Sequence, residues 1–246
     1  MMKMDKAIQS NHLADFVGKN FDSFKTKEGS QHIATFSSQL NFLENFCKLD
    51  VSNILDFGSG IGTFVPIMLT FSKAQIVAVE KNAWCMEQFE INMSQSFPDF
   101  KTRVHLVSEI ISAQYDIVVI DDDISRKELH MLLKSRRLKY IFIEGWRNRT
   151  VSHISKRLPF FGYSAEFVRG NSRLQDFSRL GKHGIHREKA GSWFLLEQTS
   201  LVVGIYSWII RLHKTKEITE TFKGFFYFVL RKLNIRQRFT KLYQQI

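Results

Sequence analysis

The chain has 246 residues, of which 44% are hydrophobic and 24% are charged. This apolar content excludes a disordered or low-complexity chain, and the length suits one domain with appendages rather than two large domains. The net charge of +11 and the presence of only two cysteines, Cys47 and Cys85, indicate a basic protein with reduced thiols.

The charge is distributed unevenly. Residues 1–123 carry 10 basic and 16 acidic side chains, residues 124–190 carry 16 and 5, and residues 191–246 carry 9 and 3. The basic part predicts an anionic partner, such as a phosphate-bearing substrate, nucleic acid or an anionic membrane, although a solvated basic face gives the same pattern. Because we find neither a secretory signal pattern nor an apolar run long enough to span a bilayer, we expect a cytoplasmic protein.

A helix is expected before the first strand. Apolar side chains recur there at spacings of three and four residues, at Ile33, Phe36, Leu40, Leu43 and Phe46. We therefore predict an N-terminal helical segment over residues 1–50.

Beyond residue 50, short apolar runs alternate with helical patterns, which is typical of a βαβ fold. The expected strands are Asn53–Phe57, Gln75–Glu80, Arg103–Val107, Tyr115–Ile120 and Lys139–Glu144. Their uniformly apolar composition favours a parallel sheet that is covered on both faces. Asn82 and Ser125 are the expected N-caps of the helices that follow two of these strands, and Pro66 suits the start of another helix.

Two further strands, Tyr163–Arg169 and Ser192–Glu197, are expected to pair antiparallel. The segment from Gly170 to Gly191 between them is too long for a tight hairpin, so we predict an irregular functional loop. We place the main domain at residues 51–200.

The segment ILDFGSGIGTF is the strongest signal in the chain. It ends a strand with Asp56 and then places Gly58, Gly60 and Gly62 at alternate positions before a helix. Glycine lets the backbone turn tightly and approach a ligand, and the helix that follows offers unpaired N–H groups. This pattern indicates a site for a group with carboxylate or phosphate character, although alternating glycines also serve close packing.

A carboxylate also ends the next strand, at Glu80, where an acid can accept both hydroxyls of a ribose. Together with the strand-four sequence YDIVVIDDD, these residues resemble the class I S-adenosylmethionine-dependent methyltransferases. The resemblance covers about residues 53–144, or 53–197 with the final strand pair. The glycine spacing differs from that of the dinucleotide dehydrogenases, which makes NAD the weaker cofactor candidate.

This resemblance implies an α/β fold with a doubly wound, mostly parallel seven-stranded sheet, the Rossmann-like methyltransferase fold. It implies S-adenosyl-L-methionine as cofactor, with the binding residues Asp56, Gly58, Ser59, Gly60, Gly62, Glu80 and Glu109. Glu109, after strand three, is the candidate for contact with adenine, although the Gly-Asp pair usual there is missing.

Methyl transfer requires positioning of the acceptor and removal of a proton. Asp121 is the first candidate base and Asp122 the second, with an acidic loop that only precedes the next helix as the alternative interpretation. We expect no metal, although Asp121, Glu144 and Asn148 have suitable ligand types.

The acceptor is less clearly indicated. The chain lacks the Asn-Pro-Pro-aromatic or Asp-Pro-Pro-aromatic sequence after strand four that marks members of the family that methylate the amino groups of bases and glutamine. We therefore expect O-methylation of a small-molecule or carbohydrate-like acceptor, bound by Arg147, Arg149 and His186. The alternatives are an RNA methyltransferase that uses the basic C-terminal half, and a non-catalytic membrane-docked or scaffold protein.

Residues 201–246 are expected to form a basic amphipathic helical appendage. Its apolar stripe consists of Ile218, Phe222, Phe225, Val229 and Leu233. Packing on the domain or on a second subunit, binding to an anionic membrane surface and contact with nucleic acid all fit this pattern.

Overall fold

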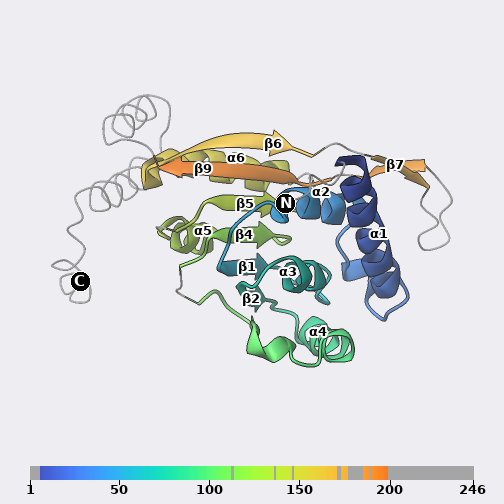
Figure 1. Ribbon diagram of the computed structural model, residues 1–246. Helices are drawn as coiled ribbons and strands as arrows, with labels where there is room; N and C mark the ends of the chain where they lie inside the picture. Colours follow the sequence, from blue (N-terminus) through green and yellow to red (C-terminus); the bar gives the residue numbers. More distant parts are fainter. Residues whose placement is uncertain are drawn as a thin grey trace.

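The computed structural model describes residues 6–111, 114–135, 137–145, 147–170, 173–176, 185–188 and 190–198 (Figure 1). The predicted appendage over residues 201–246 lies outside this part of the chain. Among the described residues, no helix is both long and apolar enough to cross a membrane.

Helices alternate with strands along most of the chain. The helices are α1 (Lys6–Lys25), α2 (Phe36–Phe46), α3 (Val65–Phe71), α4 (Ala83–Ser96), α5 (Arg126–Leu133) and α6 (Asn148–Arg157), with short 3-10 helices at η1 (Ser30–His32), η2 (Phe100–Thr102) and η3 (Leu158–Phe161). The strands are β1 (Asn53–Phe57), β2 (Gln75–Val79), β3 (Val104–Val107), β4 (Ile117–Ile120), β5 (Tyr140–Ile143), β6 (Tyr163–Arg169), β7 (Arg173–Asp176), β8 (Ile185–Glu188) and β9 (Ser192–Gln198).

Seven strands form one twisted sheet in the order β3-β2-β1-β4-β5-β9-β6. The pairs from β3 to β5 are parallel, whereas β9 runs antiparallel to both β5 and β6, as its reversed arrow in Figure 1 shows. This arrangement confirms the predicted α/β fold with a mostly parallel seven-stranded sheet and the predicted antiparallel final pair.

Two apolar cores cover the two faces of the sheet. Helices α1 to α4 pack on one face together with Ile54, and helices α5 and α6 pack on the other together with Leu55 and Phe57. Neighbouring residues of β1 thus point to opposite faces, as the two-residue period of a strand requires. Both faces are buried along most of β1, β2, β4 and β5, which explains why these strands are mainly apolar, whereas the edge strand β6 is exposed after Tyr163.

Helix α1 precedes the helix expected from the sequence and joins the same core. Its Val17 and Phe21 belong to the cluster that also contains Ile54. The side-chain amide of Asn20, also in α1, donates to Gln39 Oε1 at 2.8 Å and to the carbonyl of Thr63 at 3.0 Å. The N-terminal helices are therefore packed on the sheet and reach the segment that precedes α3.

The irregular loop expected between Gly170 and Gly191 contains two strands. β7 and β8 pair antiparallel and form a separate two-stranded sheet, so the prediction of a wholly irregular segment is wrong. Each strand has four residues and a single aliphatic side chain, so no alternating apolar pattern marks it in the sequence.

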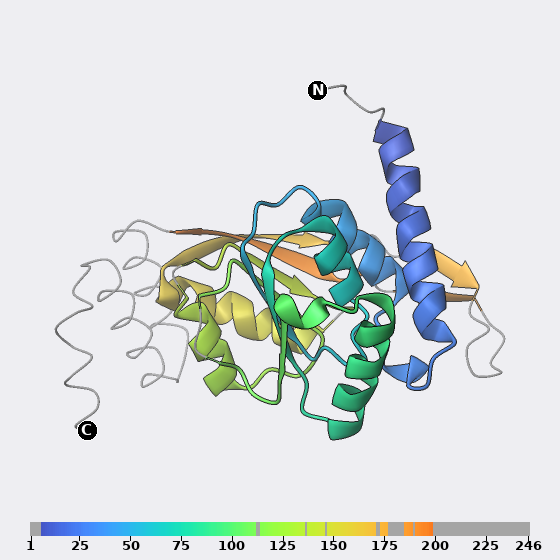
Figure 2. The same ribbon diagram turned by 60° about the horizontal axis from the view of Figure 1, so that its bottom comes forward.

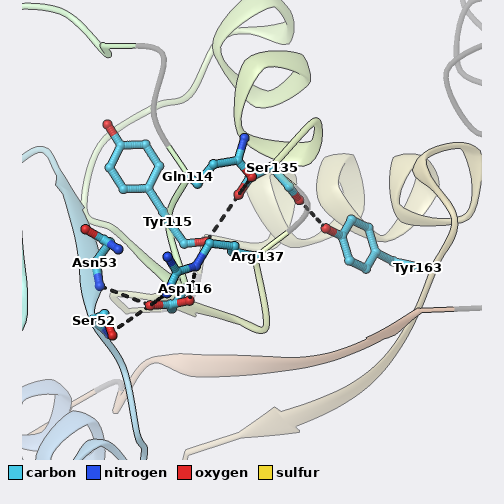
Figure 3. Close-up of polar contacts among 8 residues, drawn as sticks. All are labelled: Ser52, Asn53, Gln114, Tyr115, Asp116, Ser135, Arg137 and Tyr163. Carbon is cyan, nitrogen blue, oxygen red and sulfur yellow. Dashed lines mark hydrogen bonds and ion pairs between the residues drawn. The ribbon is translucent and has the colours of Figure 1, made fainter. Parts of the chain in front are cut away.

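A polar cluster fixes the amino ends of β1 and β4, as Figure 3 shows. The buried carboxylate of Asp116 accepts hydrogen bonds from the main-chain N–H groups of Ser52 and Asn53, at 2.8 and 3.0 Å. It also forms an ion pair with Arg137 at 3.1 Å. Nearby, the Tyr163 hydroxyl donates to the carbonyl of Ser135. These contacts lie at the opposite end of the strands from the glycine segment and hold the sheet together.

Candidate active site

The registers of four neighbouring parallel strands bring the predicted site residues into one row. Phe57 is paired with Val79 of β2 and with Ile120 of β4, and Ile120 is paired with Ile143 of β5. The next residue on each strand is therefore at the same edge of the sheet. This row consists of Glu80, Gly58, Asp121 and Glu144.

The three glycines form the turn that leaves β1. Gly58, Gly60 and Gly62 have φ angles of 84°, 55° and 94°, in the left-handed region that side chains other than glycine rarely adopt. A Cβ atom added to Gly58 would lie 2.7 Å from the Cβ of Asp122. The glycine turn thus lies directly against the segment that follows β4, where the candidate base is located.

A second segment covers the turn. A Cβ atom on Gly60 would lie 2.8 Å from the carbonyl oxygen of His32, and the His32 ring lies 6.1 Å from the ring of Trp84 at the start of α4. No local sequence pattern predicts that the η1 segment approaches the glycines. Residues of η1 and α4 therefore border the predicted cofactor site.

Glu80 connects β2 to the glycine turn. Its Oε2 accepts a hydrogen bond from the Gly60 N–H at 2.8 Å, and its Oε1 accepts one from the Asn82 N–H, also at 2.8 Å. Asn82 itself caps α4, as expected, by accepting from the N–H groups of Trp84 and Cys85. A carboxylate has about four acceptor positions, so Glu80 keeps capacity for ribose hydroxyls.

Asp56, the last but one residue of β1, has a buried carboxylate without a partner. The residue is 1% exposed, and neither carboxylate oxygen accepts a hydrogen bond from the described residues. Burial is the main reason why the pKa of Asp56 is raised to about 7; the neighbouring Ser59 hydroxyl offsets part of this effect, and the nearby Glu80 adds a smaller increase that is included in this value. The Ser59 hydroxyl donates to the main-chain carbonyl of Asp56, at 2.9 Å.

Asp121 is the centre of a second acidic group. Its Oδ1 accepts an ion-paired hydrogen bond from Arg147 at 2.7 Å, and its main-chain carbonyl accepts from the same guanidinium at 2.6 Å. Burial raises the pKa of Asp121 well above its ordinary value, and the adjacent Glu144 raises it further, whereas Arg147 lowers it. Glu144 Oε1 also lies 3.5 Å from both the N–H and the hydroxyl of Thr35.

The remaining predicted site residues do not belong to the row that Glu80, Gly58, Asp121 and Glu144 form. Asp122 is exposed, and its Oδ1 accepts from the N–H of Asp123. Glu109 is exposed after β3. Arg149, also exposed, lines a pocket between α5 and α6. His186 lies in β8, of which only the backbone is described.

Two residues of this group were not predicted in their roles. From the sequence, Glu144 is expected only as a possible metal ligand and Arg147 only as an acceptor-binding residue, yet both interact with Asp121. Glu144 could have been found, because the carboxyl ends of adjacent parallel strands lie at one edge. Among the described residues, there is no group of three or more His, Cys, Asp or Glu side chains that could hold a metal ion.

The arrangement fits a nucleoside cofactor that carries a cation. The unpartnered carboxylate of Asp56 requires a positively charged or hydrogen-bonding group, and an amino acid ammonium or a sulfonium would supply the charge. Glu80 offers acceptors on the neighbouring strand, and the glycine turn brings backbone close to both. Asp56, Glu80 and the glycine turn are thus the residues that would hold S-adenosylmethionine.

Comparison with known proteins supports the fold assignment. No protein-family model and no curated protein matches the chain. Among solved structures, the precorrin-6Y C5,15-methyltransferase of Geobacter metallireducens is similar over 71% of this chain and 93% of its own, with a TM-score of 0.53 and 16% identity. A candidate RNA methyltransferase of Pyrococcus horikoshii is similar over 74% and 99%, with a TM-score of 0.54 and 11% identity.

A third similar structure is the C-terminal domain of precorrin-6Y C5,15-methyltransferase from Rhodobacter capsulatus. It covers 68% of this chain and 90% of its own, with a TM-score of 0.50 and 12% identity. At identities of 11–16%, these likenesses concern the fold. The chain therefore has the fold of the class I S-adenosylmethionine-dependent methyltransferases.

Proposed function

We propose that the protein is an S-adenosylmethionine-dependent methyltransferase that methylates an oxygen atom of a small-molecule or carbohydrate-like acceptor. The observation that carries this proposal is the row of Glu80, Gly58, Asp121 and Glu144 across four adjacent strands. In this proposal Glu80 binds the nucleoside and Asp121 is the base, and the two residues follow the strands on either side of β1. When bound, the cofactor supplies a methyl group that is already activated as part of a sulfonium.

In this proposal Asp121 removes the proton from the acceptor hydroxyl. A carboxylate accepts a proton more readily when its pKa is raised, and burial together with Glu144 raises the pKa of Asp121. Arg147 holds the Asp121 side chain through Oδ1 and through the main-chain carbonyl. The guanidinium also favours the ionised carboxylate, so Asp121 can give up its proton before the next turnover.

The test is methyl transfer from tritiated S-adenosylmethionine to fractionated cell extract, with wild type and Asp121→Asn. Loss of a general base typically slows the chemical step by about 100-fold or more, so we expect that fall in kcat with little change in cofactor affinity. Asp22→Asn, at an exposed position on α1, makes the same charge change away from the site and should leave the rate unchanged. Transfer at the wild-type rate by Asp121→Asn would refute the role of this residue.

RNA is the second candidate acceptor. Residues 124–190 carry 16 basic and 5 acidic side chains, and one of the similar structures is a candidate RNA methyltransferase. Label that appears in the RNA fraction would favour this acceptor. Label in no fraction, from a protein that binds the cofactor, would support a non-catalytic role instead.

A further inference from the structure

A pocket of about 620 Å³ lies beside the candidate active site, between the first turn of α5 and one side of α6 from Arg149 to Lys156. Its polar lining comes mainly from basic and hydroxyl side chains, among them Arg126, Arg149, Thr150, Ser152, His153 and Lys156. Figure 2 shows the two helices next to each other, in yellow-green and yellow, and their apolar sides belong to the same core. The volume is within the range of small-molecule sites, so the pocket has room for more than a single ion.

The two helices differ at their N-termini. Ser125 and Glu128 form a capping box on α5, so Ser125 Oγ and Glu128 Oε2 accept hydrogen bonds from main-chain N–H groups there. Helix α6 has no side-chain cap and no acidic residue in its first turn. Its first N–H groups therefore lack the side-chain acceptor that helices usually provide, and an anion would supply it.

Two lining residues on α6 have side chains without a partner among the described residues. Thr150 is 5% exposed and lines the pocket, and its hydroxyl forms no hydrogen bond with this part of the chain. Arg149 forms neither an ion pair nor a hydrogen bond there. The Thr150 hydroxyl and the Arg149 guanidinium border the same cavity and are complementary to a ligand with several acceptor oxygens.

The charge of the lining selects the kind of ligand. Among the described residues of the lining, Arg126, Arg149 and Lys156 are cationic and Asp123 is the only acidic one. A guanidinium donates two parallel hydrogen bonds to a phosphate, and a lysine supplies a point charge. A dianionic phosphate makes fuller use of these groups than a neutral sugar does.

The pocket and the candidate base are joined by short pieces of chain. Asp123 lines the pocket and Asp121 is two residues earlier, while Arg149 lines the pocket and Arg147 is ion-paired with Asp121. Residues two apart have Cα atoms separated by at most about 7 Å. The backbone of the pocket lining is thus within about 7 Å of the backbone of Asp121 and of Arg147.

We propose that this pocket binds the phosphate of a phosphorylated small-molecule acceptor, whose hydroxyl then faces Asp121. The proposal rests on the proposed methyltransferase function for the role of the ligand, whereas the binding of phosphate rests on the pocket alone. It names the acceptor class as a phosphate monoester, such as a sugar phosphate.

The test is calorimetric titration of the full chain at about 0.15 M salt, where the field of distant surface charges is largely screened. The probes are glycerol 3-phosphate and, as the uncharged equivalent, glycerol. We expect binding of glycerol 3-phosphate alone. Arg149→Gln and Lys156→Gln should each weaken it by about tenfold, because each removes a charge-assisted hydrogen bond.

Lys127→Gln is the matched control. Lys127 is exposed on α5 next to Arg126, does not line the pocket, and carries the same charge as Lys156. Its substitution should change the affinity by less than about twofold. An equal loss in Lys127→Gln and Lys156→Gln, or no binding of glycerol 3-phosphate by wild type, would overturn the proposal.

Two further titrations separate the possible failures. If unfractionated tRNA binds, loses affinity in Arg149→Gln and Lys156→Gln, and glycerol 3-phosphate does not bind, the pocket serves a nucleic acid and the proposal is wrong. Titration with S-adenosylhomocysteine tests the proposed function separately. Binding of this compound without glycerol 3-phosphate rejects the phosphate pocket alone, and the reverse result rejects the methyltransferase function while the pocket stands.

Discussion

Asp56 has a buried carboxylate that lacks hydrogen-bond donors in the described part of the chain. A buried carboxylate normally has hydrogen-bond donors around it, and neither oxygen of Asp56 has one among the described residues. Asp116 shows the contrast, because two N–H groups and Arg137 satisfy its equally buried carboxylate. We interpret Asp56 as a group whose ionised form is favoured only when a cationic ligand is bound.

This interpretation predicts a pH-dependent stability of the ligand-free protein. The pKa of Asp56 is raised from 3.8 to about 7, so between these pH values the folded protein keeps a proton that the unfolded chain loses. The corresponding stabilisation is fully present below pH 3.8 and is lost as the pH rises to about 7, on the order of 4 kcal/mol in total. Asp56→Asn has no carboxyl group to ionise at this buried position, so it should be more stable than wild type at pH 8.

Urea denaturation at pH 5, 6, 7 and 8 measures the effect. The gap between Asp56→Asn and wild type should widen with pH. Asp122→Asn, an exposed carboxylate at the same edge of the sheet, is the control and should follow wild type. Parallel curves for wild type and Asp56→Asn would show that the buried carboxylate carries no such penalty.

Candidate site residues could be predicted from the sequence where they stand at the carboxyl end of a recognisable strand. Asp56, Glu80 and Asp121 were predicted because they end or follow apolar strands. The partners of Asp121 depend on contacts between distant segments. Thr35 is 109 residues away from Glu144 in the sequence, and no local sequence pattern predicts that the two residues lie close together.

At the scale of elements, the glycine turn depends on the η1 segment that covers it. Gly60 has a φ of 55°, and a Cβ there would lie 2.8 Å from the main-chain oxygen of His32. Gly145 has a similar φ of 64°, but a Cβ there would meet nothing within 4 Å. Substitution of Gly145 therefore tests backbone strain alone, whereas substitution of Gly60 tests strain together with a clash against a neighbouring segment.

We predict that Gly60→Ala destabilises the fold more than Gly145→Ala. Both substitutions force a side chain into the left-handed region, at about 1–2 kcal/mol. Only Gly60→Ala also displaces η1, which adds about 1–3 kcal/mol as overpacking does elsewhere. The free energy of unfolding from denaturant titration checks this order, and equal losses would mean that η1 does not pack on the glycine turn.

The elements themselves differ in how well the sequence predicts them. Uniformly apolar, β-branched runs mark the central strands, and Ser125 and Asn82 cap their helices as expected. The first residues of β4 and β5 are predicted less accurately, because both strands begin later than expected, at Ile117 and Tyr140. Pairing between strands decides where a strand begins, and the composition of one segment does not contain that information.

At the scale of the whole molecule, the strand order β3-β2-β1-β4-β5-β9-β6 sets the location of function. β1 lies at the centre, between β2 and β4, so residues that follow these strands converge at one edge. The fold class was predictable because apolar strands and helices alternate regularly along the chain. The β7–β8 sheet was not, because its short strands carry too few apolar side chains to indicate pairing.

In the proposed function, the edge beside β1 and β2 binds a sulfonium nucleoside through the carboxylate of Glu80. Calorimetric titration with S-adenosylhomocysteine, on wild type, Glu80→Gln and Glu87→Gln, measures this binding. Glu87 is an exposed residue of α4 and matches the charge change outside the site. We predict that wild type and Glu87→Gln bind one molecule with equal affinity, and that Glu80→Gln binds about tenfold or more weakly, because hydrogen bonds to a charged acceptor are lost. Equal affinity in Glu80→Gln and wild type, or no binding by wild type, would contradict the account.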